Sequence, residues 1–98
     1  MTLTQLRYFL AVIRCGSISG AAAQIHVAQP AVSQRLRQLE EELGQALFRR
    51  LPRGIELTRA GHHLKEHALE ILRRVDSVQN DFKSSGINPF GNVTLGMS

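Results

Sequence analysis

A run of small and polar side chains has the spacing of one helix face: Gln29, Pro30, Ser33, Gln34 and Arg37. At about 100° per residue these positions stay on one side of a helix, and none of them is acidic. A glutamine amide donates and accepts at once, which matches the major-groove edge of adenine, and an arginine pairs with guanine or a phosphate. Proline can touch a thymine methyl group, and serine is short enough to let the helix reach the groove floor. The run therefore predicts a helix that reads base pairs in duplex DNA.

An ordinary solvated helix face is the alternative for these side chains, and the neighbouring arginines favour DNA. Arg53 stands between Pro52 and Gly54, which predicts a rigid loop tip that presents one guanidinium to a minor groove. Arg49 and Arg50 precede this tip. We expect both to contact phosphates, with simple solvent exposure as their alternative.

A second set of side chains, His63, Glu66 and His67, matches the H-x-x-E-H string of certain zinc peptidases. Such an enzyme also needs a third ligand, a cleft and a substrate-binding region. Solvated histidines on a helix surface are the simpler interpretation, so we predict no catalytic residue, no metal site and no cofactor. The single cysteine, Cys15, excludes an internal disulfide and a four-cysteine zinc site.

Apolar periodicity predicts the elements that must position these side chains. We expect helices over 3–15, 18–25, 29–43 and 59–82, and a β-hairpin over 47–57 with its tip at 51–54. Thr2 and Gln5 have the spacing of a capping box, and Ser17 is a natural N-cap whose helix start has free N–H groups for a phosphate. Thr58 has the same capping role for the long helix. A hinge and a short strand are predicted after residue 84.

Two helices show apolar faces suited to a common core. The predicted core positions are Leu6, Phe9, Leu10 and Ile13 in the first helix, and Val32, Leu36, Leu39 and Leu43 in the third.

The long helix carries a heptad stripe, which is typical of a helix that packs against another helix. Its members are Leu57, Gly61, Leu64, Ala68, Ile71, Val75, Val78 and Phe82. A helix of about 25 residues spans roughly 37 Å, longer than so small a head domain can cover. We therefore predict a homodimer through Leu64, Ala68, Ile71, Val75, Val78 and Phe82, with packing on the chain's own head or on another domain as the alternative.

Charge is concentrated in the first sixty residues of this 98-residue chain. The net charge is +4, and the whole excess falls there, because the basic and acidic side chains beyond residue 60 cancel. A basic head suits a polyanionic partner. No stretch reads as a secretory signal or a membrane span, so we expect a cytoplasmic protein with no membrane partner.

These motifs, in this order, resemble the N-terminal domain of LysR-type transcriptional regulators. The segments that carry the resemblance are QLRYFLAV, GSISGAA, HVAQPAVSQRLRQLEEELG, LFRR and RGIELTRAG, followed by the long helix. Two positions depart from the family pattern. Ala28 stands where the family usually has serine, and it cannot cap the third helix. Leu51 replaces a more polar residue at the wing.

The resemblance implies a mainly α fold: a winged helix-turn-helix of three helices and a two-stranded β wing, then a long dimerisation helix. It implies DNA contacts by Gln29, Pro30, Ser33, Gln34, Arg37 and Arg53. It also implies antiparallel pairing of the long helices, and a small-molecule effector that acts through a C-terminal domain absent here. Tetramers are then expected only in a full-length form.

The chain is accordingly divided into residues 1–58 as the DNA-binding domain, 59–84 as the dimerisation helix and 85–98 as the hinge and first strand of that further domain. Two-fold symmetry requires an inverted-repeat DNA site. Two other functions stay open at this point. One is the winged-helix head of another family, such as the molybdate-responsive regulators, and the other is a dimerisation module that does not bind DNA.

Overall fold

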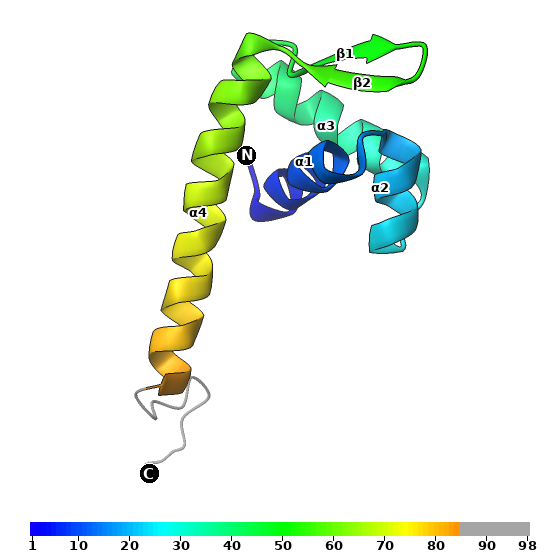
Figure 1. Cartoon of the computed structure of the whole chain (residues 1–98). Coiled ribbons are helices and arrows are strands. Elements are labelled where there is room, and N and C mark those ends of the chain that lie inside the picture. The colour runs from blue at the N-terminus through cyan, green and yellow to red at the C-terminus, as the bar shows by residue number, and fades with distance from the viewer. Residues whose placement is uncertain (85–98) are drawn as a thin grey trace.

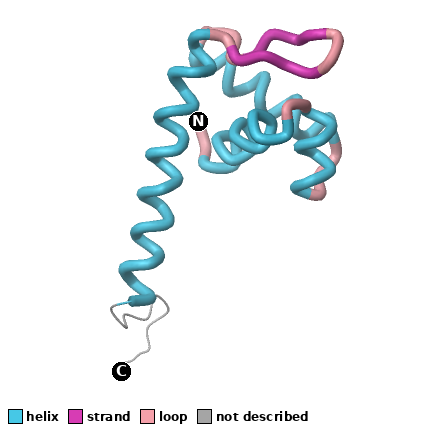
Figure 2. The backbone as a smooth tube through the Cα atoms, in the orientation of Figure 1, coloured by secondary structure: helices cyan, strands magenta, loops and turns pink. Residues whose placement is uncertain are grey.

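The computed structural model describes residues 1–84 and shows a small helical head beside one long helix (Figures 1 and 2). The elements in chain order are α1 (Leu3–Cys15), α2 (Ile18–Ile25), α3 (Gln29–Leu43), β1 (Phe48–Leu51), β2 (Gly54–Leu57) and α4 (Arg59–Ser84). The predicted mainly α winged helix-turn-helix with a long final helix is confirmed. The hinge and strand predicted for 85–98 lie outside the described residues.

Local capping explains why the helices begin where the sequence predicts. Thr2 Oγ1 accepts the Gln5 N–H at 3.1 Å, and Gln5 Oε1 accepts the Thr2 N–H at 2.9 Å, which completes the predicted capping box. Ser17 Oγ accepts the Gly20 N–H at 3.0 Å and begins α2. Ala28 takes the N-cap position of α3 without a side-chain hydrogen bond, as its methyl group requires.

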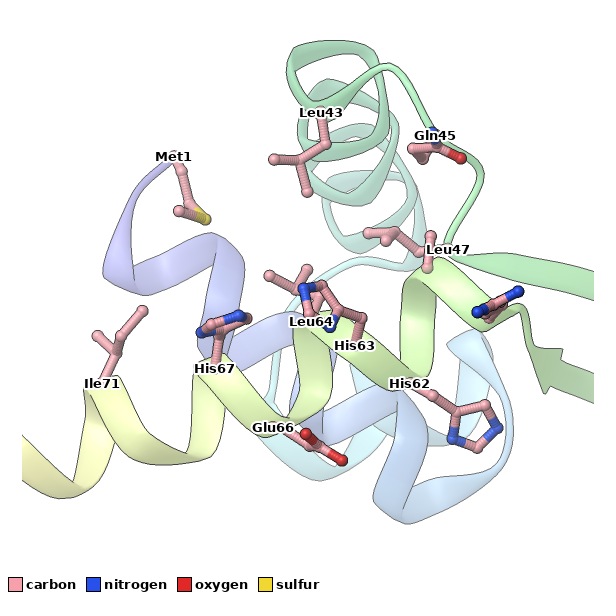
Figure 3. A pocket seen from close by; sticks show the side chains of 12 residues that line it. Met1, Leu43, Gln45, Leu47, His62, His63, Leu64, Glu66, His67 and Ile71 are labelled. Atoms are coloured by element: carbon pink, nitrogen blue, oxygen red, sulfur yellow. The ribbon is translucent and has the colours of Figure 1, made fainter.

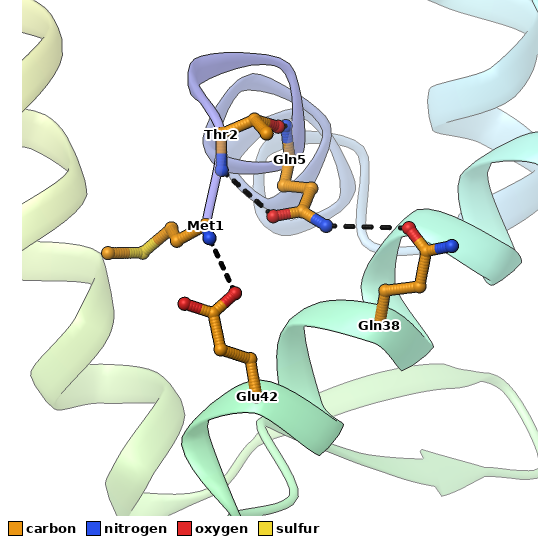
Figure 4. A network of polar contacts seen from close by, with 5 residues as sticks. All are labelled: Met1, Thr2, Gln5, Gln38 and Glu42. Carbon is orange, nitrogen blue, oxygen red and sulfur yellow. Dashed lines mark hydrogen bonds and ion pairs between the residues drawn. The ribbon is translucent and has the colours of Figure 1, made fainter.

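A network of polar contacts joins the start of α1 to the exposed side of α3 (Figure 4). The amino group of Met1 lies 2.5 Å from Glu42 Oε1, and Gln5 Nε2 lies 3.5 Å from Gln38 Oε1. Gln5 is the one buried polar side chain in the described core. These contacts link the C-terminal half of α3, the helix that carries the predicted reading face, to the start of α1.

The hydrophobic core lies where α1, α2 and α3 meet, and it is closed by the base of the hairpin and the first half of α4. Phe9, Val32, Leu39 and Leu47 have at most 1% of their surface exposed. The predicted core face of α3 is confirmed for three of its four positions, but Leu43, the last residue of the helix, is 39% exposed.

The hairpin is held to the core at its base. β1 and β2 pair antiparallel with Phe48 opposite Leu57 and Leu51 opposite Gly54. The Phe48 ring packs on Phe9 with 5.3 Å between ring centroids. The tip is therefore shorter than predicted, because Leu51 and Gly54 already belong to the strands.

α4 packs on the head only over its first half and then extends beyond it (Figure 1). Gly61, Leu64 and Ala68 are buried within this single chain. Leu57, predicted as the start of the heptad stripe, is instead the last residue of β2. Val78 and Phe82 are 57% and 41% exposed. The alternative of packing on the chain's own head thus holds for the first part of the stripe and not for its end.

Within residues 1–84, no single helix is long and apolar enough to span a membrane. Only the pair Leu3–Cys15 and Ile18–Ile25, bent by 116°, passes that test of length and composition together. Both helices contribute buried residues to the core of the head.

Candidate DNA-binding interface

The candidate reading face of α3 points away from the core. Val32, Leu36 and Leu39 bury the opposite side of the helix, with at most 4% of each residue exposed. This places Gln29 and Gln34 on the exposed side of the helix. Apolar packing fixes the rotation of α3 about its own axis. The predicted reading face is therefore held on the outer side of the helix.

The five predicted reading residues are brought together on one helix. Gln29, Pro30, Gln34 and Arg37 are exposed, and Ser33 is half-buried. Pro30 stands in the first turn of α3, where it interrupts no helical hydrogen bond. The turn into α3 depends on His26, whose φ of 61° is left-handed. The Val27 N–H donates to the Ala22 carbonyl at 3.0 Å and closes this turn.

A small hollow of about 90 Å³ lies between α3 and the hairpin. Ser33 and Arg37 line it from α3, and Arg50 lines it from β1. The reading face of α3 and the hairpin therefore border one continuous surface with two guanidinium groups. Glu40 is also at this hollow, and its carboxylate Oε2 accepts the Leu47 N–H at 2.7 Å.

The hairpin tip carries Arg53 between the two strands, fully outside the core. Gly54 follows it with a φ of 109°, a conformation that favours glycine. A Cβ added at Gly54 would lie only 2.8 Å from the Gly16 carbonyl oxygen. The tip thus packs against the turn between α1 and α2. The sequence did not predict this contact.

The other residues predicted to contact phosphates differ in whether their side chains already have a partner within the chain. Arg50 is exposed at the hollow, whereas Arg49 Nη2 pairs with Glu56 Oε1 across the hairpin at 3.0 Å. Ser17 Oγ is engaged as the N-cap of α2. Its hydroxyl proton and the start of α2 remain the groups that can face a phosphate.

The H-x-x-E-H residues lie on the surface of α4. The His63 and His67 rings meet edge to face with 4.8 Å between centroids. His63, Glu66 and His67 are all exposed. In the part of the chain that the structure describes, no three histidine, cysteine or acidic side chains are grouped so as to hold a metal ion.

The hairpin base is held by hydrogen bonds of Thr58 that the sequence did not predict. Thr58 Oγ1 accepts the Gly61 N–H at 3.0 Å and donates to the Ala46 carbonyl at 2.6 Å. The Thr58 N–H donates to the Leu47 carbonyl at 3.0 Å. The cap predicted for α4 therefore also closes the hairpin, so one threonine joins the candidate wing to the long helix.

The helix-turn-helix, the outward face of α3 and the hairpin beside it define a winged helix-turn-helix protein. The sequence matches the family described as "Bacterial regulatory helix-turn-helix protein, lysR family" over residues 3–62. The chain belongs to the LysR family of bacterial regulators and is a LysR-type helix-turn-helix DNA-binding domain.

Relatives at the sequence level are regulators. The chain is 41% identical to the HTH-type transcriptional regulator BudR of Klebsiella aerogenes over 98 residues, which is all of this chain and 68% of BudR. It is 39% identical to the nitrogen assimilation regulatory protein nac of the same organism, again over the whole chain but only 32% of nac. The chain thus spans about a third of the second relative.

Solved structures with the same fold include complexes with DNA. The CbnR DNA-binding domain in complex with DNA superposes with a TM-score of 0.82 and 38% identity, over 88% of this chain and 99% of that one. The BenM DNA-binding domain on the benA site 1 DNA gives a TM-score of 0.81 and 38% identity, over 86% and 98%. These comparisons favour a LysR head over the molybdate-responsive and non-binding alternatives.

Proposed function

We propose that this chain binds an inverted-repeat DNA site as a homodimer, with α3 in the major groove and the hairpin tip in the adjacent minor groove. The observation that carries the proposal is the surface shared by α3 and the hairpin, where Ser33 and Arg37 adjoin Arg50. Relatives of known structure, the CbnR and BenM domains, were solved on DNA, which supports the same activity here.

Each predicted side chain has a role in this proposal. Gln29 and Gln34 read base edges, because an exposed amide pairs with adenine. Arg37 reaches guanine or a phosphate from the same face. Arg53 enters the minor groove from the tip, and Arg50 contacts a phosphate. Pro30 and Ser33 keep the helix close to the groove floor.

Arg49 and Ser17 are proposed to contact phosphates and not bases. The ion pair between Arg49 and Glu56 is exposed on both sides, and exposed pairs contribute about 0–1 kcal/mol, so a phosphate can displace the carboxylate. Ser17 contacts a phosphate through its hydroxyl proton and the N-terminus of α2. Both contacts position the domain and carry no base specificity.

The homodimer that we propose forms through the part of α4 beyond the head. Leu64 and Ala68, which the sequence assigned to this contact, are 8% and 0% exposed in the single chain, because the head already covers them. Ile71, Val75, Val78 and Phe82 are left for a second copy, and none of these four is buried. The dimer contact is thus proposed to lie further along α4 than the sequence indicates.

We propose that each part of the whole regulator has its own function. Residues 1–58 bind DNA, residues 59–84 form the dimerisation helix, and a small-molecule effector acts through a further C-terminal domain. The length of the nac relative, of which this chain spans 32%, supports the last part. Tetramers are proposed only for a form that carries that domain.

Selection of bound sites from a random duplex library, followed by mobility-shift titration, tests the function. We expect a two-fold symmetric site. The Gln29→Ala variant should lose about 1–3 kcal/mol of discrimination at one base pair in each half-site, since one bidentate contact is removed. Arg53→Ala should weaken binding without changing the preferred bases that α3 reads.

Two exposed positions on α4 provide matched controls: Asn80→Ala for the amide and Arg73→Ala for the guanidinium. Both should leave DNA affinity unchanged within a factor of two. Failure of the wild-type chain to bind any duplex at low salt would contradict the proposed function.

A further inference from the structure

One large apolar side chain of the hairpin is exposed. Leu51 has 46% of its surface accessible and precedes Pro52, which is also exposed. Elsewhere in residues 1–84, the exposed side chains of Met1 and Leu43 border an apolar groove of about 840 Å³ between the head and α4 (Figure 3). Leu51 lies outside that groove and within the candidate DNA-binding interface. A single exposed leucine is common on protein surfaces, so the position of Leu51 is more informative than its exposure.

The pairing of the two strands gives the hairpin an inner and an outer face. Phe48 packs on the core and Arg50 lines the hollow beside α3, so both belong to the inner face. Successive side chains of a strand point to opposite faces, which places Arg49 and Leu51 on the outer face. The partner of Leu51 on β2 is Gly54, which has no side chain to cover it.

The outer face is apolar near the tip. Arg49 pairs with Glu56 across the strands at 3.0 Å, so the charges of this face largely cancel. Leu51 and Pro52 follow toward the tip, and neither can donate a hydrogen bond to a phosphate through its side chain. Apolar side chains of this kind contact sugars and bases where proteins enter the minor groove. The outer face is therefore suited to the deoxyribose wall of a groove.

The position of the hollow decides which DNA strand each face meets. If α3 lies in the major groove and the tip in the adjacent minor groove, the backbone between these grooves runs over the hollow. Arg37 and Arg50 line that hollow, so the inner face meets this strand. The minor groove of B-DNA is only about 6 Å wide, so a hairpin inside it also touches the other wall. That wall belongs to the opposite strand and faces Leu51.

We propose that Leu51, supported by Pro52, packs on deoxyribose sugars of this opposite strand. The hairpin then contacts both walls of the minor groove, one through the charge of Arg50 and the other through apolar surface. The proposal rests on the proposed function and adds the strand and the chemistry of one contact.

Titration of the selected duplex tests the energetic part. Leu51→Thr keeps a residue that favours strands but removes most of the apolar surface. Both copies lose the contact, so binding should weaken by about tenfold, and Leu51→Met should restore wild-type affinity. The slope of affinity against salt should stay unchanged in Leu51→Thr, because no phosphate contact is lost, whereas Arg50→Ala should reduce that slope.

Leu69→Gln provides the matched control. Leu69 is 52% exposed and lies on α4, on the opposite side of the helix from the heptad stripe. The control should bind the duplex like the wild type. Urea denaturation checks that the Leu51 variants are as stable as the wild type.

Hydroxyl-radical footprinting tests the geometry, because these radicals abstract hydrogen from the sugars that border the minor groove. The wild type should protect sugars on both strands at the hairpin. Leu51→Thr should lose protection on the opposite strand and keep it on the strand between α3 and the hairpin.

Unchanged affinity of Leu51→Thr, or equal loss of protection on both strands, overturns the sugar contact. A wild-type chain that binds the duplex but leaves the opposite strand unprotected overturns the contact and leaves the proposed function standing. A wild-type chain that binds no duplex overturns both.

Discussion

The close approach of Gly61 to the hairpin base predicts that Gly61→Ala destabilises the domain. A Cβ at this position would lie 2.2 Å from the Leu47 carbonyl oxygen and 2.7 Å from Leu57 Cδ2. Alanine gains about 1 kcal/mol over glycine inside a helix, but forcing an extra carbon into a packed site costs about 1–3 kcal/mol. The nearest atom belongs to the backbone and cannot rotate away, which places the cost at the upper end of that range. We expect a net loss of about 1–2 kcal/mol.

Urea denaturation at fixed protein concentration measures this loss, because dimerisation makes apparent stability depend on concentration. Ser77→Ala is the matched control, since Ser77 is exposed on the same helix. It should raise stability by about 0.5 kcal/mol through helix propensity alone. The Gly61 variant should also bind DNA more weakly, because the hydrogen bond between Thr58 and Leu47 must shift and carry the hairpin with it. A Gly61→Ala variant as stable as wild type would refute the reasoning.

Two further substitutions test the ends of α3. Ala28→Ser supplies an N-cap acceptor for the Ala31 N–H. It should raise the free energy of unfolding, measured by urea denaturation, by about 1 kcal/mol. An unchanged free energy of unfolding would show that this helix start needs no side-chain cap. Glu40→Ala leaves the part-buried Leu47 N–H without its acceptor and should cost about 1–3 kcal/mol. Glu41→Ala, on the exposed neighbour, should change stability by less than about 0.5 kcal/mol, and equal losses at both positions would contradict the role assigned to Glu40.

The boundaries of α1 and the start of α2 could be read from the sequence because nearby residues determine them. Thr2 with Gln5, Ser17 and Gly16 act within a few residues of the ends that they define. The outward face of α3 was predictable for a similar reason, since Val32 and its neighbours on the stripe leave only one side free.

Features that depend on segments far apart in the chain were not predictable in this way. A heptad stripe indicates which side of α4 is apolar, but it does not indicate which surface packs against that side. Leu64 and Ala68 were therefore assigned to a second chain, although the head covers them. The bond from Leu47 to Glu40 and the contact of Gly54 with Gly16 arise only after the hairpin has folded back on the helices.

The contact between Gly54 and Gly16 bears on how the domain discriminates among DNA sites. It brings Gly54, the residue after Arg53, against the turn between α1 and α2, and Ser17 follows directly on that turn. In the proposed complex Arg53 enters the minor groove while Ser17 meets a phosphate, so binding is favoured where the shape of the duplex allows both contacts together. A-tracts have a narrow minor groove and a stronger negative potential. Affinity should therefore depend on the flexibility and shape of base steps that no side chain contacts.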